Sequence, residues 1–318
     1  MDHQQPETAA EILAQGSKSF AAATRLFGPA LRRDVTLLYA WCRHCDDVTD
    51  GQSLGHGRLD TASHEALAAL SRDSRAAARG APRDALPYRA LAEVCSRHAI
   101  PIEWIDDHLH GFALDVAGWQ PQTLSDTLCY SYHVAGVVGM MMARIMGVHD
   151  TETLARASDL GLAFQLTNIA RDVVEDAAGG RCYLPAEWLA ANVLTVEQLA
   201  DPMHHPALFG QVTRLLDTAE PYYASARIGL RALPPRAAWA VATALGVYRD
   251  IGRQLLRRGP DGLAARVVTP KSRKLWRMFT GTGALVARRR ADSRRRSATL
   301  WTPPRLTTAV AEAISPAH

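Results

Sequence analysis

Two stretches of this 318-residue sequence carry acidic side chains in a spacing that fits metal chemistry. The first contains Asp46, Asp47 and Asp50, which follow Arg43. An α-helix turns about 100° per residue, so on a helix these three carboxylates and the arginine share one face. A solvated helix end is the ordinary interpretation of such a charge run, although the helix dipole disfavours acidic residues at a C-terminus. The first stretch alone therefore does not establish a site.

The second acidic stretch lies in an otherwise apolar segment farther along the chain. Gln165, Asn168, Asp172 and Asp176 form a narrow polar stripe on one helix face, with Glu175 at its edge. Two helices with Asp-x-x-x-Asp spacing suggest carboxylates that meet across a shared cavity. Because buried carboxylates need cations, and oxygen ligands without His or Cys favour a hard ion, we expect Mg²⁺, with Mn²⁺ as an alternative. Mg²⁺ completes its coordination with substrate phosphates, which points to metal-assisted departure of a diphosphate.

The elements that must position these residues are helices. Apolar residues recur at three-to-four spacing up to about residue 265, and alternating strand patterns are hard to find. Helices are expected over 37–45, 85–97, 102–116, 124–146, 153–174, 196–199, 206–230 and 237–256. We therefore predict an all-α, single-domain helical bundle with a central cavity. Its expected divisions are an N-terminal extension (1–14), the helical domain (15–280) and a basic, mobile C-terminal tail (281–318).

Composition and charge exclude several classes of protein. Lys and Arg number 36 against 32 Asp and Glu, and the apolar fraction of 47% is typical of a globular chain rather than a disordered one. The longest apolar run, 134–143, is about half of a membrane span, and the N-terminus lacks the apolar run of a secretory signal. Five cysteines without an export signal indicate a reducing, cytoplasmic setting. The pairs Cys42-x-x-Cys45 and Cys95-x-x-His98 have zinc-ligand spacing but no surrounding turn residues, so we interpret these cysteines as packing residues.

The residues around both acidic stretches resemble the squalene/phytoene synthase family, whose members share an isoprenoid synthase fold. The segments that carry the resemblance are 130–139 and 160–185, which look like the two family signatures, with shorter matches at 16–20 and 39–43. The resemblance covers about residues 15–275. Where the family often has a His before its Ser-x-Ser element, this chain has Gly16.

The resemblance implies a role for each matched side chain. The metal ligands that it implies are Asp46, Asp50, Asn168, Asp172 and Asp176. The substrate-binding residues are Ser17, Ser19, Arg43, Gln165, Asn168, Arg171, Arg266 and Lys271, of which the last two are transferred on local pattern only. The catalytic residues are Asp46, Asp50, Asp172, Asp176, Tyr130 and Tyr248. The roles of Asp47 and Glu175 stay open.

The family's chemistry joins two prenyl diphosphates head to head, through a cyclopropyl diphosphate intermediate, and releases two diphosphates. Residues 38–47 look most like the bacterial phytoene synthases of this family. The resemblance therefore implies two C20 geranylgeranyl diphosphates as substrates and phytoene as product, the first step of carotenoid biosynthesis. The small residues at 21–24 agree with a deep pocket. Within the family, the alternative is squalene or dehydrosqualene synthesis from two C15 farnesyl diphosphates.

An alternative from another class is a helical module that binds phosphates, nucleic acid or a membrane through the arginines of 288–296. Such a module would not need two inward-facing carboxylate stripes, so we expect no nucleic-acid partner. The basic cluster is instead expected to bring an enzyme of lipid substrates to anionic lipid at the inner face of the membrane. We expect a monomer or a weak homo-oligomer.

Overall fold

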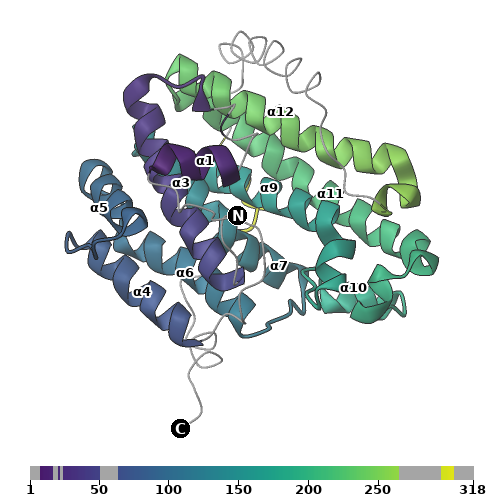
Figure 1. Ribbon diagram of the computed structural model, residues 1–318. Coiled ribbons are helices and arrows are strands. Elements are labelled where there is room, and N and C mark those ends of the chain that lie inside the picture. Colours follow the sequence, from purple (N-terminus) through teal and green to yellow (C-terminus); the bar gives the residue numbers. More distant parts are fainter. Residues whose placement is uncertain (1–7, 17–20, 22–23, 51–63, 265–294, 304–318) are drawn as a thin grey trace.

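The computed structural model describes residues 8–16, 21, 24–50, 64–264 and 295–303, and within these ranges the chain forms helices and no strands (Figure 1). The α-helices are α1 (Ala9–Gly16), α3 (Pro29–Asp50), α4 (His64–Ala78), α5 (Leu86–His98), α6 (Ile102–Val116), α7 (Leu124–Ser131), α8 (Val137–Ile145), α9 (Thr151–Ala178), α10 (Ala186–Ala191), α11 (His205–Gly229) and α12 (Pro235–Arg258). Shorter helical turns are η1 (Tyr132–Gly136), η2 (Val196–Ala200), η3 (Pro202–His204), η4 (Leu230–Ala232) and η5 (Gly259–Leu263). The predicted all-α fold is confirmed.

The helices differ from the sequence prediction in several places. The single helix expected over 124–146 is divided into α7 and α8 by η1, which is a π-helical turn. Helices α1, α4 and α10 were not among the expected elements. The apolar residues of α4 are mostly alanines, which give a weak periodic pattern. Helix α3 begins eight residues before and ends five residues after the expected range 37–45, and the segment expected over 196–199 is the 3-10 turn η2. The remaining expected helices differ by at most a few residues at their ends, where sequence patterns are least informative.

Helix α9 is the element around which the others are arranged. It packs against α8, α11, α12 and η1, and Figure 1 shows it passing through the interior of the bundle. The Asp150 side chain caps its start by accepting a 2.8 Å hydrogen bond from the backbone N–H of Thr153. It ends at Gly179–Gly180, where Gly180 takes a left-handed φ of 77° that suits a glycine. These signals fix the register of the polar stripe along 28 residues.

Two glycines allow the segment 132–145 to lie directly against α9. A Cβ added at Gly161 would lie 2.2 Å from the carbonyl oxygen of Ala135, and one at Gly139 would lie 2.4 Å from that of Ala157. No side chain fits at such distances, so backbone meets backbone at both points. This contact fixes how far α8 stands from α9.

Helix α3 presents one face to the core and another toward α8. Pro29 occupies its first turn, where a missing N–H costs nothing. Trp41 and Cys45 are fully buried, and the Trp41 indole Nε1 donates to the Ser74 hydroxyl of α4 at 3.0 Å. The packing of Trp41 sets the rotation of α3 and with it the direction of the acidic residues that follow.

Within the tail predicted for 281–318, the structure describes residues 295–303. These residues contact the helical domain: Arg296 pairs with Asp159 of α9, and Leu300 is buried. The indole Nε1 of Trp301 donates to the Ser125 hydroxyl of α7 at 3.2 Å. Arg295 is exposed, and the other arginines of the basic cluster lie outside the described residues. None of the described helices combines the length and apolar character that a membrane crossing requires.

Candidate active site

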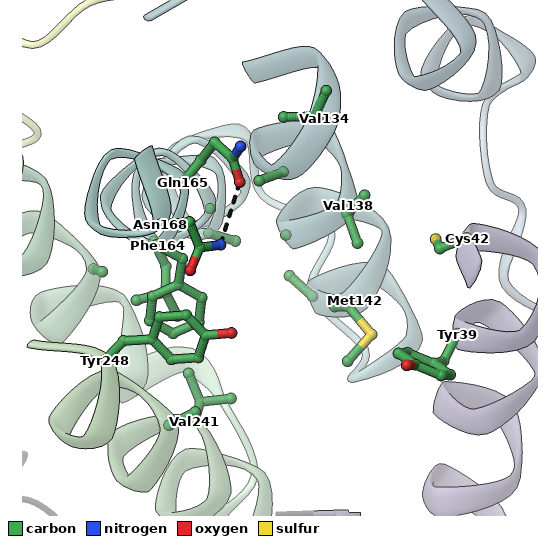
Figure 2. A pocket seen from close by; sticks show the side chains of 18 of the residues that line it. Tyr39, Cys42, Val134, Val138, Met142, Phe164, Gln165, Asn168, Val241 and Tyr248 are labelled. Carbon is green, nitrogen blue, oxygen red and sulfur yellow. Dashed lines mark hydrogen bonds between the residues drawn. The ribbon is translucent and has the colours of Figure 1, made fainter. Parts of the chain in front are cut away.

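A cavity of about 730 Å³ lies between α3, α6, α8, α9 and α12. Asp46 of α3 lines it together with Asp172 and Asp176 of α9, so both acidic stretches reach one cavity. Figure 2 shows the arrangement from inside, with Tyr39 and Cys42 of α3 facing Asn168 and Phe164 of α9 across the open space. The convergence that the Asp-x-x-x-Asp spacings predicted is therefore present for the three carboxylates that the structure describes.

The α9 carboxylates differ in how their charge is balanced. Arg171 donates to both carboxylate oxygens of Asp172, at 2.7 Å from Nε to Oδ1 and through a second, shorter contact from Nη2 to Oδ2. Among the described residues, Asp176 has no comparable hydrogen bond from an arginine side chain. Burial and the neighbouring charge of Asp172 raise the pKa of Asp176 from its ordinary 3.8 to about 7, against the opposing effect of Arg181. A cation at this point would stabilise the ionised form of Asp176.

On α3, the Asp47 carboxylate pairs with the Arg43 side chain and does not line the cavity. Its Oδ1 accepts hydrogen bonds from Arg43 Nη2 at 2.6 Å and Nε at 3.1 Å, and both side chains are about 15% exposed. Arg43 lines the cavity and lies 3.7 Å from Asp46, which is half exposed. Asp47 therefore orients Arg43 so that positive charge faces the cavity beside Asp46.

A fourth acidic residue, Asp115 of α6, lines the same cavity and was missed from the sequence. The Tyr130 hydroxyl donates to both of its oxygens at 3.0 Å, and the Tyr183 hydroxyl donates to Oδ1 at 2.9 Å. The two tyrosine rings stack with centroids 4.7 Å apart. Burial, followed by the charge of Asp115, raises the pKa of Tyr130 far above its usual range, so the phenol keeps its proton. The only sequence signal that could have singled out Asp115 is its position near the C-terminal end of the predicted helix 102–116, where the helix dipole disfavours an acidic residue.

The polar stripe of α9 also carries an unsatisfied oxygen. Asn168 Nδ2 donates to Gln165 Oε1 at 3.4 Å (Figure 2), whereas Asn168 Oδ1 is buried and has no hydrogen-bond partner among the described residues. A buried amide oxygen one turn before Asp172 is the kind of ligand that a hard cation uses. Across the described part of the chain, however, no three His, Cys, Asp or Glu side chains group into a ready metal site. The residues fit an ion whose coordination is completed by water and by phosphate oxygens.

Below the polar stripe, aromatic side chains form part of the wall. The Tyr248 ring of α12 stacks on the Phe164 ring of α9 with centroids 4.1 Å apart, and both line the cavity (Figure 2). His108 of α6 packs between Trp41 and Phe112, and burial lowers the pKa of its imidazole to about 4. His108 is therefore neutral and adds no charge to a largely apolar wall.

The structure does not test every residue that the resemblance implied. Tyr130, Tyr248, Arg43, Gln165, Asn168 and Arg171 line the cavity with the three carboxylates. Ser17, Ser19, Arg266, Lys271 and the side chain of Asp50 lie outside the described residues. Glu175 is exposed and is not part of the cavity wall.

Comparison of the fold with solved structures defines its class. It superimposes on a dehydrosqualene synthase with a TM-score of 0.78 at 25% identity, covering 88% of this chain and 95% of that one. It also matches the squalene synthase HpnC of Alicyclobacillus acidocaldarius with a TM-score of 0.70 at 22% identity, covering 79% and 92%. The bundle is therefore of the isoprenoid synthase type, as predicted.

The sequence comparisons identify the family. The family pattern described as squalene/phytoene synthase matches residues 13–274, and the chain belongs to this family. It is 52% identical to a 15-cis-phytoene synthase of Enterobacter agglomerans over 293 residues, which cover 91% of this chain and 99% of the relative. It is 49% identical to a 15-cis-phytoene synthase of Pantoea ananas, covering 93% and 97%. The family prediction and the likeness to bacterial phytoene synthases are confirmed.

Proposed function

We propose that this protein condenses two geranylgeranyl diphosphates head to head into phytoene and releases two diphosphates. The observation that carries the proposal is near-50% identity to bacterial phytoene synthases over almost the whole chain. The cavity agrees with it, because one polar end with carboxylates and arginines continues into a long apolar space. Such a space suits a substrate with a charged head and a long hydrocarbon tail.

In the proposed mechanism the polar end binds the diphosphate. We assign Mg²⁺ to Asp46, Asp50, Asn168, Asp172 and Asp176, where it would neutralise the charge that develops on the departing diphosphate. Mn²⁺ would fit the same oxygen ligands.

Positive side chains at the same end complete the diphosphate site. Arg43, Arg171 and Arg181 all line the cavity and would contact diphosphate oxygens. The ion pairs of Arg43 with Asp47 and of Arg171 with Asp172 hold two of these guanidinium groups in place before the substrate arrives. Preorganised charge of this kind lowers the cost of building negative charge in the transition state.

The walls beyond the polar end then protect the allylic cation that remains. The stacked Phe164 and Tyr248 rings present aromatic faces, whose attraction for a cation is worth about 0.5–2 kcal/mol. The apolar side chains of α8, among them Val138 and Met142, keep water from quenching the cation (Figure 2). Attack by the double bond of the second substrate, with loss of one proton, gives the cyclopropyl diphosphate. Departure of its diphosphate, rearrangement of the resulting cation and loss of a second proton then give the hydrocarbon in the same cavity.

A direct assay tests the proposal. Purified protein is incubated with Mg²⁺ and either the C20 or the C15 diphosphate, and the hydrocarbon product is identified by mass spectrometry. We expect phytoene from the C20 substrate. A C30 hydrocarbon formed in preference from the C15 substrate would instead make the chain a dehydrosqualene or squalene synthase, and no product from either would reject the condensation.

We further propose that the protein works in the cytoplasm, with peripheral contact at the membrane, because its substrates and product partition into lipid. Co-sedimentation with anionic and neutral vesicles tests this contact. Loss of binding on replacing the arginines of 288–290 by alanine supports it, and equal sedimentation of both proteins rejects it.

A further inference from the structure

The cavity extends far beyond the carboxylates, and a buried arginine stands in its wall at the far end. Its lining follows α9 from Asp176 back to Thr153, a length of about 35 Å along the helix axis. Arg156 belongs to this lining and is only 4% exposed. It stands sixteen residues before Asp172, which corresponds to about 24 Å along the axis. The proposed diphosphate chemistry gives this distant arginine no role.

Arg156 is held by a closed ring of polar contacts. Its Nη2 donates to Glu152 Oε1 at 2.6 Å, and its Nη1 lies 3.4 Å from the Ser225 hydroxyl of α11. Ser225 donates in turn to Asp159 Oδ2 at 2.5 Å. Arg296, from the segment 295–303, donates to both oxygens of Asp159 at 2.7 and 2.9 Å. The backbone N–H of Arg296 closes the ring by donating to Glu152 Oε1 at 3.0 Å.

The segment 295–303 is itself fixed to the bundle at a second point. The Trp301 backbone N–H donates to the Tyr222 hydroxyl of α11 at 3.2 Å, and its indole donates to Ser125 of α7. The Trp301 carbonyl accepts a 2.7 Å hydrogen bond from Arg296 Nη2, which couples the two points. Leu300, between them, is 7% exposed. The segment is thus anchored on α7, α9 and α11 at once.

Arg296 matters to Arg156 because Asp159 is almost fully buried, at 1% exposure. Without Arg296, this buried carboxylate would keep only the Ser225 hydroxyl among its contacts in the described part of the chain. An unpaired buried charge is strongly unfavourable, so the nearest cation is drawn to it. Arg156 is that cation, since it lies three residues earlier on the same helix, where side chains meet. Its guanidinium would then leave its contacts with Glu152 and Ser225 and change the shape of the cavity wall.

Simple lengths indicate which substrate reaches this wall. With C–C bonds of about 1.5 Å, the 16-carbon main chain of a geranylgeranyl group extends to about 19 Å, and the diphosphate adds roughly 5 Å. Its far end therefore falls beside Arg156 when the diphosphate lies beside Asp172. A farnesyl chain, one isoprene unit shorter, stops about 5 Å earlier, which is one helical turn and corresponds to Leu160.

We propose that Arg156 limits the length of the prenyl chain at the far end of the cavity, and that the segment 295–303 holds Arg156 in place through Arg296 and Asp159. Arg156 is the specificity residue, and Arg296 and Asp159 are positioning residues. The inference rests on the proposed function, because it takes the hydrocarbon tail to run along α9.

The test compares C15, C20 and C25 prenyl diphosphates as substrates of the full-length protein. We expect Arg156→Ala to raise kcat/KM for the C25 substrate relative to the C20 substrate about tenfold, the scale of a change in an apolar pocket. Arg296→Ala should shift the ratio in the same direction, and Arg296→Lys, which keeps the charge, should restore most of it. Arg295→Ala is the matched control: it removes an exposed arginine next to Arg296 and should leave the ratio unchanged.

A second variant tests the same wall in the opposite direction. A Cβ added at Gly229 would lie 3.0 Å from the Cβ of Arg156, so Gly229→Ala pushes the arginine stem toward the cavity. We expect Gly229→Ala to favour the C15 substrate over the C20 substrate. Binding of the unreactive thio-diphosphate analogues, measured by calorimetry, gives the same comparison without turnover.

The outcomes separate the two proposals. Folded Arg156→Ala and Gly229→Ala proteins with the wild-type length profile would overturn the inference, as would an equal shift in Arg295→Ala. If the wild-type protein neither turns over nor binds any prenyl diphosphate, the proposed function is rejected instead. Thermal unfolding of each variant shows that the altered profile belongs to a folded protein.

Discussion

The charge of Asp176 should make the metal-free protein less stable as the pH rises. Burial and Asp172 raise the pKa of Asp176 from 3.8 to about 7, so the folded state holds a proton that the unfolded state has already released. Stability is therefore fully present below about pH 4 and is lost as the pH rises through about 7. The difference between the folded and unfolded pKa values of Asp176 corresponds to about 4 kcal/mol in the free energy of unfolding. Because the Asp176 side chain is partly exposed in the cavity, solvent screens its charge, and we expect about half of this stability effect, about 2 kcal/mol.

Asp176→Asn removes this effect with little change in shape. In EDTA, the variant should exceed the wild type by about 2 kcal/mol near pH 8 and by about 1 kcal/mol or less near pH 4.5, as measured by urea unfolding at a series of pH values. For a chain of 318 residues that is a rise of about 3 °C in Tm. Mg²⁺ with inorganic diphosphate should stabilise the wild type at pH 8 more than the variant, because the ion compensates the buried charge.

Comparing the two proteins pH by pH cancels the titration of the other groups, among them His108, whose lowered pKa acts in the opposite direction. A stability difference that stays constant between about pH 5 and 8 would refute the assignment of the raised pKa to Asp176. A variant less stable than the wild type near pH 8 would refute it as well.

Three further predictions follow from single contacts. Asp46→Asn should lower kcat at least about a hundredfold with an unchanged circular dichroism spectrum, whereas an exposed Asp→Asn control should not. Gly161→Ala should lower the free energy of unfolding by about 1–3 kcal/mol in urea, because its Cβ would lie 2.2 Å from the Ala135 carbonyl oxygen; an unchanged midpoint would contradict the close approach. Tyr183→Phe should lower the free energy of unfolding by about 1–3 kcal/mol and reduce kcat, since the Asp115 carboxylate loses one of its two phenol donors. Kinetics identical to the wild type would show that the Asp115 contacts do not support the reaction.

The helical repeat explains why much of the site could be predicted from sequence. Residues four apart on a helix share a face, so the spacing of Asp172 and Asp176 already placed both on one side, and Gln165 and Asn168 with them. The apolar residues between them required burial of the remaining faces. The structure places all four in the lining of one cavity, together with Asp46 from α3.

Other parts of the site depend on contacts between distant residues, which periodicity does not encode. Asp115 is separated by eight residues from Asp107, the preceding acidic residue of α6, so it belongs to no closely spaced acidic motif. Its tyrosine donors come from positions 15 and 68 residues later. Arg296 resembles any other member of a basic run until its buried partner, Asp159, is found 137 residues earlier. A local pattern predicts a solvated tail there, because only the tertiary structure supplies the buried carboxylate.

Helix α9 relates the chemistry at one end of the cavity to the chain length at the other. Asp172 and Asp176 lie near its C-terminal end, Arg156 near its N-terminal end, and all three line the same cavity. Between them, Gly161 allows backbone contact with Ala135, so the middle of the helix cannot shift without breaking that contact. Because α9 is fixed at its centre, the number of helical turns between the diphosphate site and the cavity wall at Arg156 stays constant. A change in the end wall should therefore alter which substrate fits while leaving the carboxylates in place, and a change in the carboxylates should abolish turnover for every chain length.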